Sequence, residues 1–446
     1  MRVKVGLISL GCPKNLADSE NMLGILEESG FGITGNPDEA DVIIVNTCGF
    51  IEQAKEESIE AILQMAACKK TGKCRALVVA GCLGERYADE LWAQMPEIDA
   101  ITRAHGWVDI AGVIARVLKG ERVLLNPAAA VTVRQPRKLT APGVSAYLKI
   151  AEGCDNACSY CVIPRIRGPY ASKRMEAVLA EARDLAAAGV KEIIVVAQDV
   201  TRYGEDLYGK PLLPDLLSEI AKLPEIEWIR ILYAYPRHIT DDLLDVMAGE
   251  KKICKYIDIP LQHASDSVLA RMNRKDRKSD IRRILAKMRE KMPEIAVRTT
   301  FIAGFPGETA AEYAELKDFL LEQRFDRVGI FAYSREEGTA AAAMPQVKKK
   351  VMGRRYDELM SLQAEISEKI NKGAEGRELT VLVETAGQAG GQRVAEGRSY
   401  REAPEIDGVV YLEKAGGCQP GTFVRAKITQ GFAYDVLAEV VRGAPG

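Results

Sequence analysis

Three cysteines within eight residues constrain this chain more than any other feature of its sequence. Cys154, Cys158 and Cys161 are spaced Cys-x3-Cys-x2-Cys. Thiolates are soft ligands that suit zinc or iron–sulfur clusters. A structural zinc site takes four protein ligands, usually as two close pairs, whereas this segment offers three cysteines and no local fourth. A cubane cluster held by three cysteines keeps one iron open for a small ligand. The spacing therefore favours such a cluster, and a zinc knuckle is the alternative.

The cysteine segment follows a strand-like run at the start of a long α/β region. From residue 146 onward, apolar runs alternate with helical patterns. The expected strands are 146–151, 190–197, 227–233, 255–260, 295–303 and 326–333. The expected helices are 173–188, 212–222, 240–249, 278–291, 309–322 and 348–372. Because the units have barrel spacing but number six, we predict a partial (β/α)6 barrel over residues 144–372, with its active site at the carboxyl ends of the strands.

The first 125 residues repeat one βα plan three times. Short β-branched runs at 3–10, 41–46 and 76–80 are each followed by a helical stretch, near 18–29, 52–67 and 85–94. Continuous apolar strands alternating with helices indicate a parallel sheet that is covered on both faces. We therefore predict a separate parallel α/β domain over residues 1–125.

A second set of three cysteines follows these three strands. Cys12, Cys48 and Cys82 each stand just after a strand, 36 and 34 residues apart. Parallel strands share one carboxyl edge, where ligands collect, so the sequence predicts that these thiols converge on a second cluster. The alternative is that they are buried core cysteines, which are common. Cys68, Cys74 and Cys254 have no such placement, and we expect them to pack in the core or lie at the surface.

The residues around both sets resemble a known family. The Cys154–Cys161 spacing, with Tyr160 before the last cysteine, is similar to the radical S-adenosylmethionine superfamily. Gly11-Cys12-Pro-Lys-Asn, Asn46-Thr-Cys48 and Ala80-Gly-Cys82 resemble the methylthiotransferases of that superfamily. The resemblance implies two [4Fe-4S] clusters and S-adenosylmethionine. It makes the two cysteine sets the metal ligands, and the barrel set generates the radical. It places Tyr160 beside the adenine, and it makes four strand-end residues candidates for the cofactor site: Gln198, Gln262, Ser265 and Thr300.

Within that family, the chain is similar to the branch that modifies a ribosomal protein. Its segment Leu10-Gly-Cys-Pro-Lys-Asn15 differs from the tRNA-modifying branch, which has Gln-Met-Asn after the cysteine. The segments 163–168, 198–204 and 397–408 also resemble the ribosomal-protein branch. This implies conversion of an aspartate of small-subunit protein uS12 to 3-methylthioaspartate. One S-adenosylmethionine would serve as methyl donor and one as radical source, and the second cluster would bind the inserted sulfur. Methylthiolation of a tRNA adenosine is the nearer alternative.

The last region, residues 373–446, has five short strand candidates separated by glycine turns, at 379–384, 392–396, 408–412, 422–428 and 434–440. This pattern predicts a small antiparallel β-barrel, and the region resembles a TRAM domain. Eight Lys or Arg against ten Asp or Glu give it a net charge of −2. RNA binding needs a cationic excess. We therefore expect a basic protein partner, the ribosomal protein, in preference to tRNA. We also expect the turn 403–408 to present exposed acidic groups.

Between the first two regions, residues 126–143 are proline-rich and without periodicity, which is typical of a linker. After the barrel cysteines, Arg165 and Arg167 are candidates for holding an anion or for solvated charge. His238 and His263 are either structural or catalytic.

Composition excludes several classes of protein. No apolar run approaches the length that spans a bilayer, and we expect no signal peptide and no membrane partner. Ten cysteines without a leader indicate a reducing, cytoplasmic location. The net charge of −2 gives no general affinity for nucleic acid. An electron donor such as flavodoxin or ferredoxin is an expected partner. A non-catalytic iron–sulfur or zinc scaffold that binds ribosomes is the alternative from another class.

Overall fold

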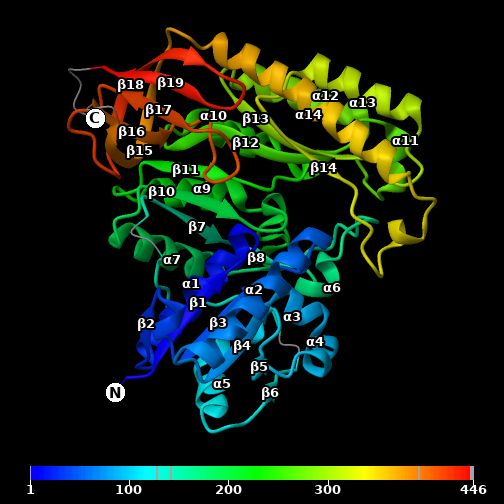
Figure 1. Ribbon diagram of the computed structural model, residues 1–446. Helices are drawn as coiled ribbons and strands as arrows, with labels where there is room; N and C mark the ends of the chain where they lie inside the picture. Colours follow the sequence, from blue (N-terminus) through cyan, green and yellow to red (C-terminus); the bar gives the residue numbers. More distant parts are fainter. Residues whose placement is uncertain (1, 127–128, 141–142, 390–391, 442–446) are drawn as a thin grey trace.

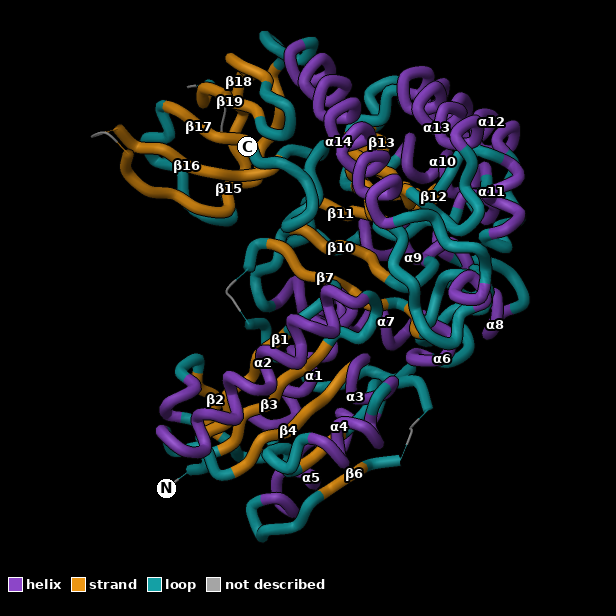
Figure 2. Tube along the Cα trace, turned by 45° about the vertical axis from the view of Figure 1, so that its right-hand side comes forward, coloured by secondary structure: helices purple, strands orange, loops and turns teal. Residues whose placement is uncertain are grey.

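The computed structural model describes residues 2–126, 129–140, 143–389 and 392–441. It has three parts in chain order: a parallel α/β domain, a larger half-barrel, and a small closed barrel. Figures 1 and 2 both show the half-barrel in the middle, with the other two parts at its opposite ends. The α/β domain therefore faces one end of the half-barrel strands, and the small barrel faces the other.

The first domain is built on a six-stranded parallel sheet of order β2-β1-β3-β4-β5-β6. Its strands are β1 (Lys4–Ser9), β2 (Gly32–Thr34), β3 (Val42–Thr47), β4 (Ala76–Gly81), β5 (Ala100–Ile101) and β6 (Val123–Leu124). Its helices are α1 (Pro13–Glu28), α2 (Glu52–Thr71), α3 (Cys82–Arg86), α4 (Ala88–Gln94) and α5 (Ile110–Val117). Strands β3 and β4 are buried at every residue, as expected for a parallel sheet with helices on both faces.

Three features of this domain differ from the prediction. The strands β2, β5 and β6 were not predicted, because each is only two or three residues long and too short to show an alternating pattern. Helix α1 begins at Pro13 and not near residue 18, because proline suits the first helical position. The expected helix 85–94 is broken at Tyr87 into α3 and α4.

The half-barrel has six parallel strands in the order β14-β13-β12-β11-β10-β7, which confirms the predicted βα units. They are β7 (Ser145–Lys149), β10 (Glu192–Val196), β11 (Trp228–Ile231), β12 (Ile253–Gln262), β13 (Ala296–Ala303) and β14 (Arg327–Ala332). The helices are α6 (Ile163–Arg167), α7 (Met175–Ala187), α8 (Glu205–Tyr208), α9 (Leu213–Ala221), α10 (Asp241–Gly249), α11 (Asp266–Arg271), α12 (Lys278–Lys291), α13 (Ala310–Gln323) and α14 (Lys349–Lys372). A short antiparallel pair, β8 (Ala151–Glu152) and β9 (Ala171–Ser172), flanks the first strand end. The largest apolar core lies between the sheet and the outer helices.

The C-terminal part is a closed barrel of order β15-β16-β17-β19-β18, as predicted in strand number. Its strands are β15 (Glu378–Ala389), β16 (Gln392–Arg398), β17 (Val410–Glu413), β18 (Phe423–Gly431) and β19 (Val436–Val440). One pairing departs from the antiparallel expectation, since β17 and β19 run parallel. Closure of the barrel leaves no free strand edge.

The acidic turn predicted at residues 403–408 is only partly exposed, since Glu405 faces solvent whereas the Asp407 side chain is buried. The segment that carries this turn, residues 398–408, follows β16. It enters the amino-terminal end of the half-barrel, where Arg398 donates to Glu192 at 2.5 Å and Arg327 donates to Glu402 at 3.0 Å. Tyr256 Oη donates to Asp407 at 2.6 Å. Asp407 of the predicted turn and Glu402 just before it thus face barrel arginines and a tyrosine, because unpaired charges inside the barrel would be costly. We call residues 398–408 the plug.

The stretch between the first domain and the half-barrel packs tightly where the structure describes it. Arg137 forms ion pairs with Glu20 of α1 at 2.6 Å and with Glu181 of α7 at 2.8 Å. All three side chains are buried. A Cβ on Gly24 would lie 2.5 Å from the backbone of Pro136. The described part of the predicted linker therefore packs between α1 and α7 and holds α1 against the half-barrel.

Candidate active site

The first cysteine set gathers at the carboxyl edge of the N-terminal sheet. Cys12 caps α1, Cys48 follows β3, and Cys82 opens α3 directly after β4. The first two loops touch: a Cβ on Gly11, whose φ is +89°, would lie 2.9 Å from Cys48 Cβ and 3.2 Å from its Sγ. Only glycine tolerates both this backbone conformation and this close approach.

Asn15 joins all three loops of this set. Its Nδ2 donates to the carbonyl of Leu10 at 3.0 Å and to that of Thr47 at 2.8 Å. Its Oδ1 accepts from the Cys82 thiol at 3.7 Å. One buried amide thus fixes the loops that carry Cys12, Cys48 and Cys82, and the structure brings the three predicted thiols together.

The thiols of this set influence one another electrostatically. Burial, with added repulsion from Cys82 and Cys12, raises the pKa of Cys48 to about 12. Burial also raises the pKa of Cys82. Burial would raise the pKa of Cys12 too, but the charges of Lys14 and Arg167 and two backbone N–H groups bring it below its ordinary value. One thiol that ionises easily beside two that do not is a donor set that a bound metal would deprotonate completely.

The second set lies in a loop held from two sides. Cys154 N donates to the carbonyl of Gly168 at 3.2 Å, and Ser159 N donates to that of Met272 at 3.0 Å. A Cβ on Gly153, at φ +71°, would lie 2.0 Å from the carbonyl oxygen of Pro169. The loop is therefore anchored at its first cysteine and again between the second and third, which leaves the thiols little freedom.

Cys154 and Cys161 of the second set resist ionisation. Burial, with repulsion from neighbouring groups, raises the pKa of Cys154 to about 11 and that of Cys161 to about 12. Within the described residues, no three Cys, His, Asp or Glu side chains are arranged to hold a single metal ion directly. A cluster does not require that arrangement, because each cysteine binds a different iron.

A buried charge network lies between the two cysteine sets. Arg167 of α6 donates to Asp18 of α1 at 2.7 Å, to Glu152 of β8 at 3.1 Å, and to Asn15 Oδ1. Lys149 of β7 donates to Glu152 at 2.7 Å and also to Asp18. The four charged side chains are each only 2% exposed. The network therefore ties the first cysteine set to the mouth of the half-barrel, and Arg167 is neither solvated nor free to hold a substrate anion.

The predicted cofactor residues lie on separate elements around the half-barrel. Gln198 follows β10 and donates to Glu152 at 2.6 Å, and its Oε1 has no partner among the described residues. Gln262 ends β12 with φ +71°. Ser265 caps α11, and its N–H donates to His263 Nδ1 at 3.0 Å. Their contact with S-adenosylmethionine remains a prediction.

The other two predicted cofactor residues are Thr300, whose neighbour Phe301 pairs with Gln262, and Tyr160. Thr300 lies within β13 beside Gly329 of β14. Tyr160 packs edge-on against Phe305, with ring centroids 6.3 Å apart. Of the two histidines, His263 is fully buried, and His238 contacts Asp199 at 3.2 Å.

Several residues at the mouth were not identified from the sequence, namely Lys14, Asp18, Lys149, Glu152 and Tyr233. Lys149 and Glu152 stand at the end of an apolar strand, where a charge is unusual. This unusual position of two charged residues was the only feature of the sequence that could have identified them as part of the site. Asp18 looked like one more polar residue of a helix, and its partners come from residues 149 and 167.

A strap of residues 334–345, after β14, closes one side of the site. Glu336 forms ion pairs with Lys55 of α2 at 3.3 Å and with Arg86 of α3 at 2.7 Å. Ala341 N donates to the carbonyl of Ser159, inside the second cysteine loop, at 2.8 Å. The strap thus contacts both parts that carry cysteines.

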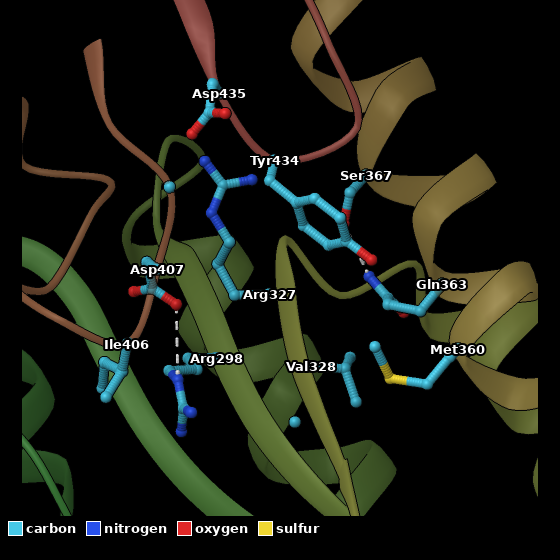
Figure 3. Close-up of a pocket in the computed structure, with 12 residues that line it drawn as sticks. Arg298, Arg327, Val328, Met360, Gln363, Ser367, Ile406, Asp407, Tyr434 and Asp435 are labelled. Carbon is cyan, nitrogen blue, oxygen red and sulfur yellow. Dashed lines mark hydrogen bonds and ion pairs between the residues drawn. The ribbon is translucent and has the colours of Figure 1, made fainter. Parts of the chain in front are cut away.

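A cavity of about 320 Å³ lies away from the cysteines, where β13 and β14 meet α14 and the C-terminal barrel (Figure 3). Arg298, Arg327, Asp407 and Tyr434 are among the residues that surround it. Arg327 opens β14, so this cavity is at the opposite strand ends from the candidate site.

Comparisons with known proteins cover the whole chain. Residues 4–103 match the uncharacterized protein family UPF0004, residues 148–320 match the radical SAM superfamily, and residues 376–441 match the TRAM domain. The ribosomal protein uS12 methylthiotransferase RimO of Pelotomaculum thermopropionicum is 52% identical over 99% of this chain and 100% of its own length. The proteins of that name from Thermoanaerobacter sp. and Geobacter sulfurreducens are 50% and 47% identical, each over 98% of this chain and at least 98% of their own length.

The chain belongs to the uS12 methylthiotransferase family. It is a radical S-adenosylmethionine enzyme that transfers a sulfur-containing group, and it uses an iron–sulfur cluster and S-adenosylmethionine. These findings favour the ribosomal-protein branch over the tRNA branch.

Solved structures support the fold of this methylthiotransferase. The radical S-adenosylmethionine methyltransferase TsrM from Kitasatospora setae superposes with a TM-score of 0.55 at 15% identity, over 88% of this chain and 82% of its own. The cobalamin-dependent radical enzyme OxsB gives a TM-score of 0.54 at 15% identity, over 82% of this chain and 56% of its own. Among the described helices, none is long and apolar enough to cross a membrane.

Proposed function

We propose that this methylthiotransferase converts an aspartate of ribosomal protein uS12 to 3-methylthioaspartate, with two [4Fe-4S] clusters. Cys154, Cys158 and Cys161 would hold one cluster, and Cys12, Cys48 and Cys82 the other. The observation that carries the proposal is the convergence of two cysteine sets on one interface, joined by Arg167 and Asn15. The names of the full-length relatives supply the substrate.

The substrate explains why such an arrangement is needed. The β-carbon C–H of aspartate is not acidic, and general acid–base catalysis contributes only about 10²–10⁴-fold. Cofactors carry chemistry of this difficulty, while the protein binds and orients them. When bound, S-adenosylmethionine and the clusters supply a 5′-deoxyadenosyl radical and a methylthio group.

The residues of the chain perform the positioning. Asn15 and Gly11 hold the first three cysteine loops in contact. Gly153 and Ser159 hold the second loop. The buried network around Arg167 fixes the two loop systems relative to each other. A misplacement of about 1 Å can cost about 10²-fold in rate, so this rigidity is functional. We also propose a cytoplasmic site of action and a small electron-transfer protein, such as flavodoxin or ferredoxin, as reductant.

The test compares two substrates and three variants under anaerobic conditions. We expect the reconstituted wild-type enzyme to methylthiolate uS12 and not tRNA, as measured by mass spectrometry. Cys158→Ala should abolish 5′-deoxyadenosine formation. Cys48→Ala should retain 5′-deoxyadenosine but lose the methylthio product. Cys418→Ala, outside both sets, is the control. Modification of tRNA alone would refute the substrate, and a fully active Cys48→Ala enzyme would refute the second cluster.

A further inference from the structure

Lys14 is a buried cation that pairs with no carboxylate of the described residues. It is the second residue of α1 and only 8% exposed. Among the residues that the structure describes, no carboxylate forms an ion pair with its Nζ, and the groups that interact with this ammonium are Tyr233 and the Cys12 thiol. Arg167, nearby on α6, differs because Asp18 and Glu152 neutralise it.

The ammonium of Lys14 lies between the two halves of the site. Its Nζ is 3.3 Å from the ring centroid of Tyr233, which follows β11 at the mouth of the half-barrel. Tyr233 has φ +65°, and its backbone N–H donates to Asp258 at 3.1 Å, so the backbone that carries the ring is held in place. Cys12 is two residues before Lys14. Figures 1 and 2 show α1 against the end of β7, at the joint between the domain and the half-barrel.

Burial of an ammonium without a counter-ion is unfavourable. The aromatic face of Tyr233 compensates part of that cost. The amino terminus of α1, a helix of 16 residues, adds a partial positive charge at the same place. Both contributions have the same sign. Beside this positive charge the described chain places the Cys12 thiol but no carboxylate, so the site attracts a carboxylate from outside the chain.

We propose that Lys14 binds the side-chain carboxylate of the aspartate that is modified. This rests on the proposed function, since it assumes an aspartate substrate. The carboxylate of aspartate is bonded directly to the β-carbon. An ammonium that holds the carboxylate therefore orients the C–H bond that must be broken. A charged contact in a buried site also selects aspartate over a neutral side chain.

The test measures discrimination between two substrates, uS12 with its native aspartate and uS12 with asparagine at that position. We expect the wild-type holoenzyme to bind the aspartate form more tightly by about 10- to 100-fold, the range for a charge-assisted contact. Lys14→Met keeps the side-chain length and removes the charge, and it should lose this preference. Lys14→Arg should keep most of it. Binding is measured by anaerobic calorimetry, and the iron content and electron paramagnetic resonance spectrum of each variant are recorded.

Three results would overturn the inference. Lys14→Met could retain the full preference for aspartate. The Lys14→Met variant could instead change the electron paramagnetic resonance spectrum or the reduction potential of the cluster while it retains the preference for aspartate. Lys14 would then act on the metal site and not on the substrate. The wild-type enzyme could bind both forms of uS12 equally. This third result is obtained with the wild-type enzyme alone, so it does not depend on whether a Lys14 variant folds. Failure of the proposed function is distinct: the wild-type enzyme would then neither bind nor modify uS12, and the role of Lys14 would fall with it.

Discussion

At the scale of single residues, this protein depends on charges placed inside its main interface. Asp18, Lys149, Glu152 and Arg167 come from four elements of two domains, the helices α1 and α6 and the strands β7 and β8, and form one buried, neutral group. Burial opposes the ionised form of Glu152, but Lys149 and Arg167 hold its pKa well below the ordinary value. A group of this kind contributes little net stability while it is complete, but loss of one member leaves a buried charge unpaired.

Arg167→Met is expected to destabilise the protein by about 3–5 kcal/mol, because Asp18 and Glu152 would then share one cation. Urea unfolding of the cluster-free protein measures this. Arg116→Met is the matched control, since Arg116 pairs with Glu121 at the surface, where both side chains are about half exposed. That control should cost less than about 1 kcal/mol. Equal losses in the two variants would contradict the role given to the network.

At the scale of elements, the plug links the C-terminal barrel to the half-barrel. Arg398 donates to Glu192 at 2.5 Å and to Glu384 at 2.8 Å, and Arg230 donates to Glu192 from β11 at 2.7 Å. Burial would raise the pKa of Glu192, but Arg398 and Arg230 lower it to about 2. A TRAM-type domain is thus part of the structure that supports the barrel interior.

The pH dependence of stability should report this contact. Because the folded pKa of Glu192 is below its ordinary value of 4.5, its stabilisation is present above about pH 4.5 and is lost as the pH falls toward about 2. Its full size is about 3 kcal/mol. Arg398→Met should remove much of it and flatten the unfolding free energy over that range. Arg425→Met, which breaks an exposed pair with Glu378, is the control. An unchanged pH profile in Arg398→Met would show that Arg398 does not hold the Glu192 carboxylate.

At the scale of the whole molecule, the three parts are interlocked. The stretch around Arg137 clamps α1, the strap carries Glu336 to Lys55 and Arg86, and the plug enters the half-barrel. The face of α1 that meets the half-barrel is polar and buried, so it cannot be exposed without hydrating those groups.

The first domain and the half-barrel are therefore expected to unfold together. Differential scanning calorimetry and hydrogen exchange of the full chain should give one transition for residues 1–126 and 143–372, because their shared interface is lost at once. The strap variant Glu336→Gln should increase exchange at residues 334–343 and in α2 without separating the transitions. Two transitions, with the first domain melting alone, would show that the interface is weak.

Much of the architecture could be predicted from local patterns. The six half-barrel strands and their helices follow from apolar runs and helical periodicity, which depend on neighbouring residues alone. The convergence of Cys12, Cys48 and Cys82 followed from one further rule, that parallel strands share a carboxyl edge. The short strands β5 and β6 could not be predicted, because two residues show no period.

The amino-acid sequence by itself determined the longer strands, most of the longer helices and the two sets of thiols, because those depend on side chains close together in the chain. Only the tertiary structure decided which charges are buried. Glu402 and Asp407 look like surface residues until the plug meets Arg327 and Tyr256. Lys14 looks like an ordinary helix residue until α1 reaches Tyr233. The reason is physical: the state and partner of a charge are set by the dielectric and the groups around it, and here those groups come from distant parts of the chain.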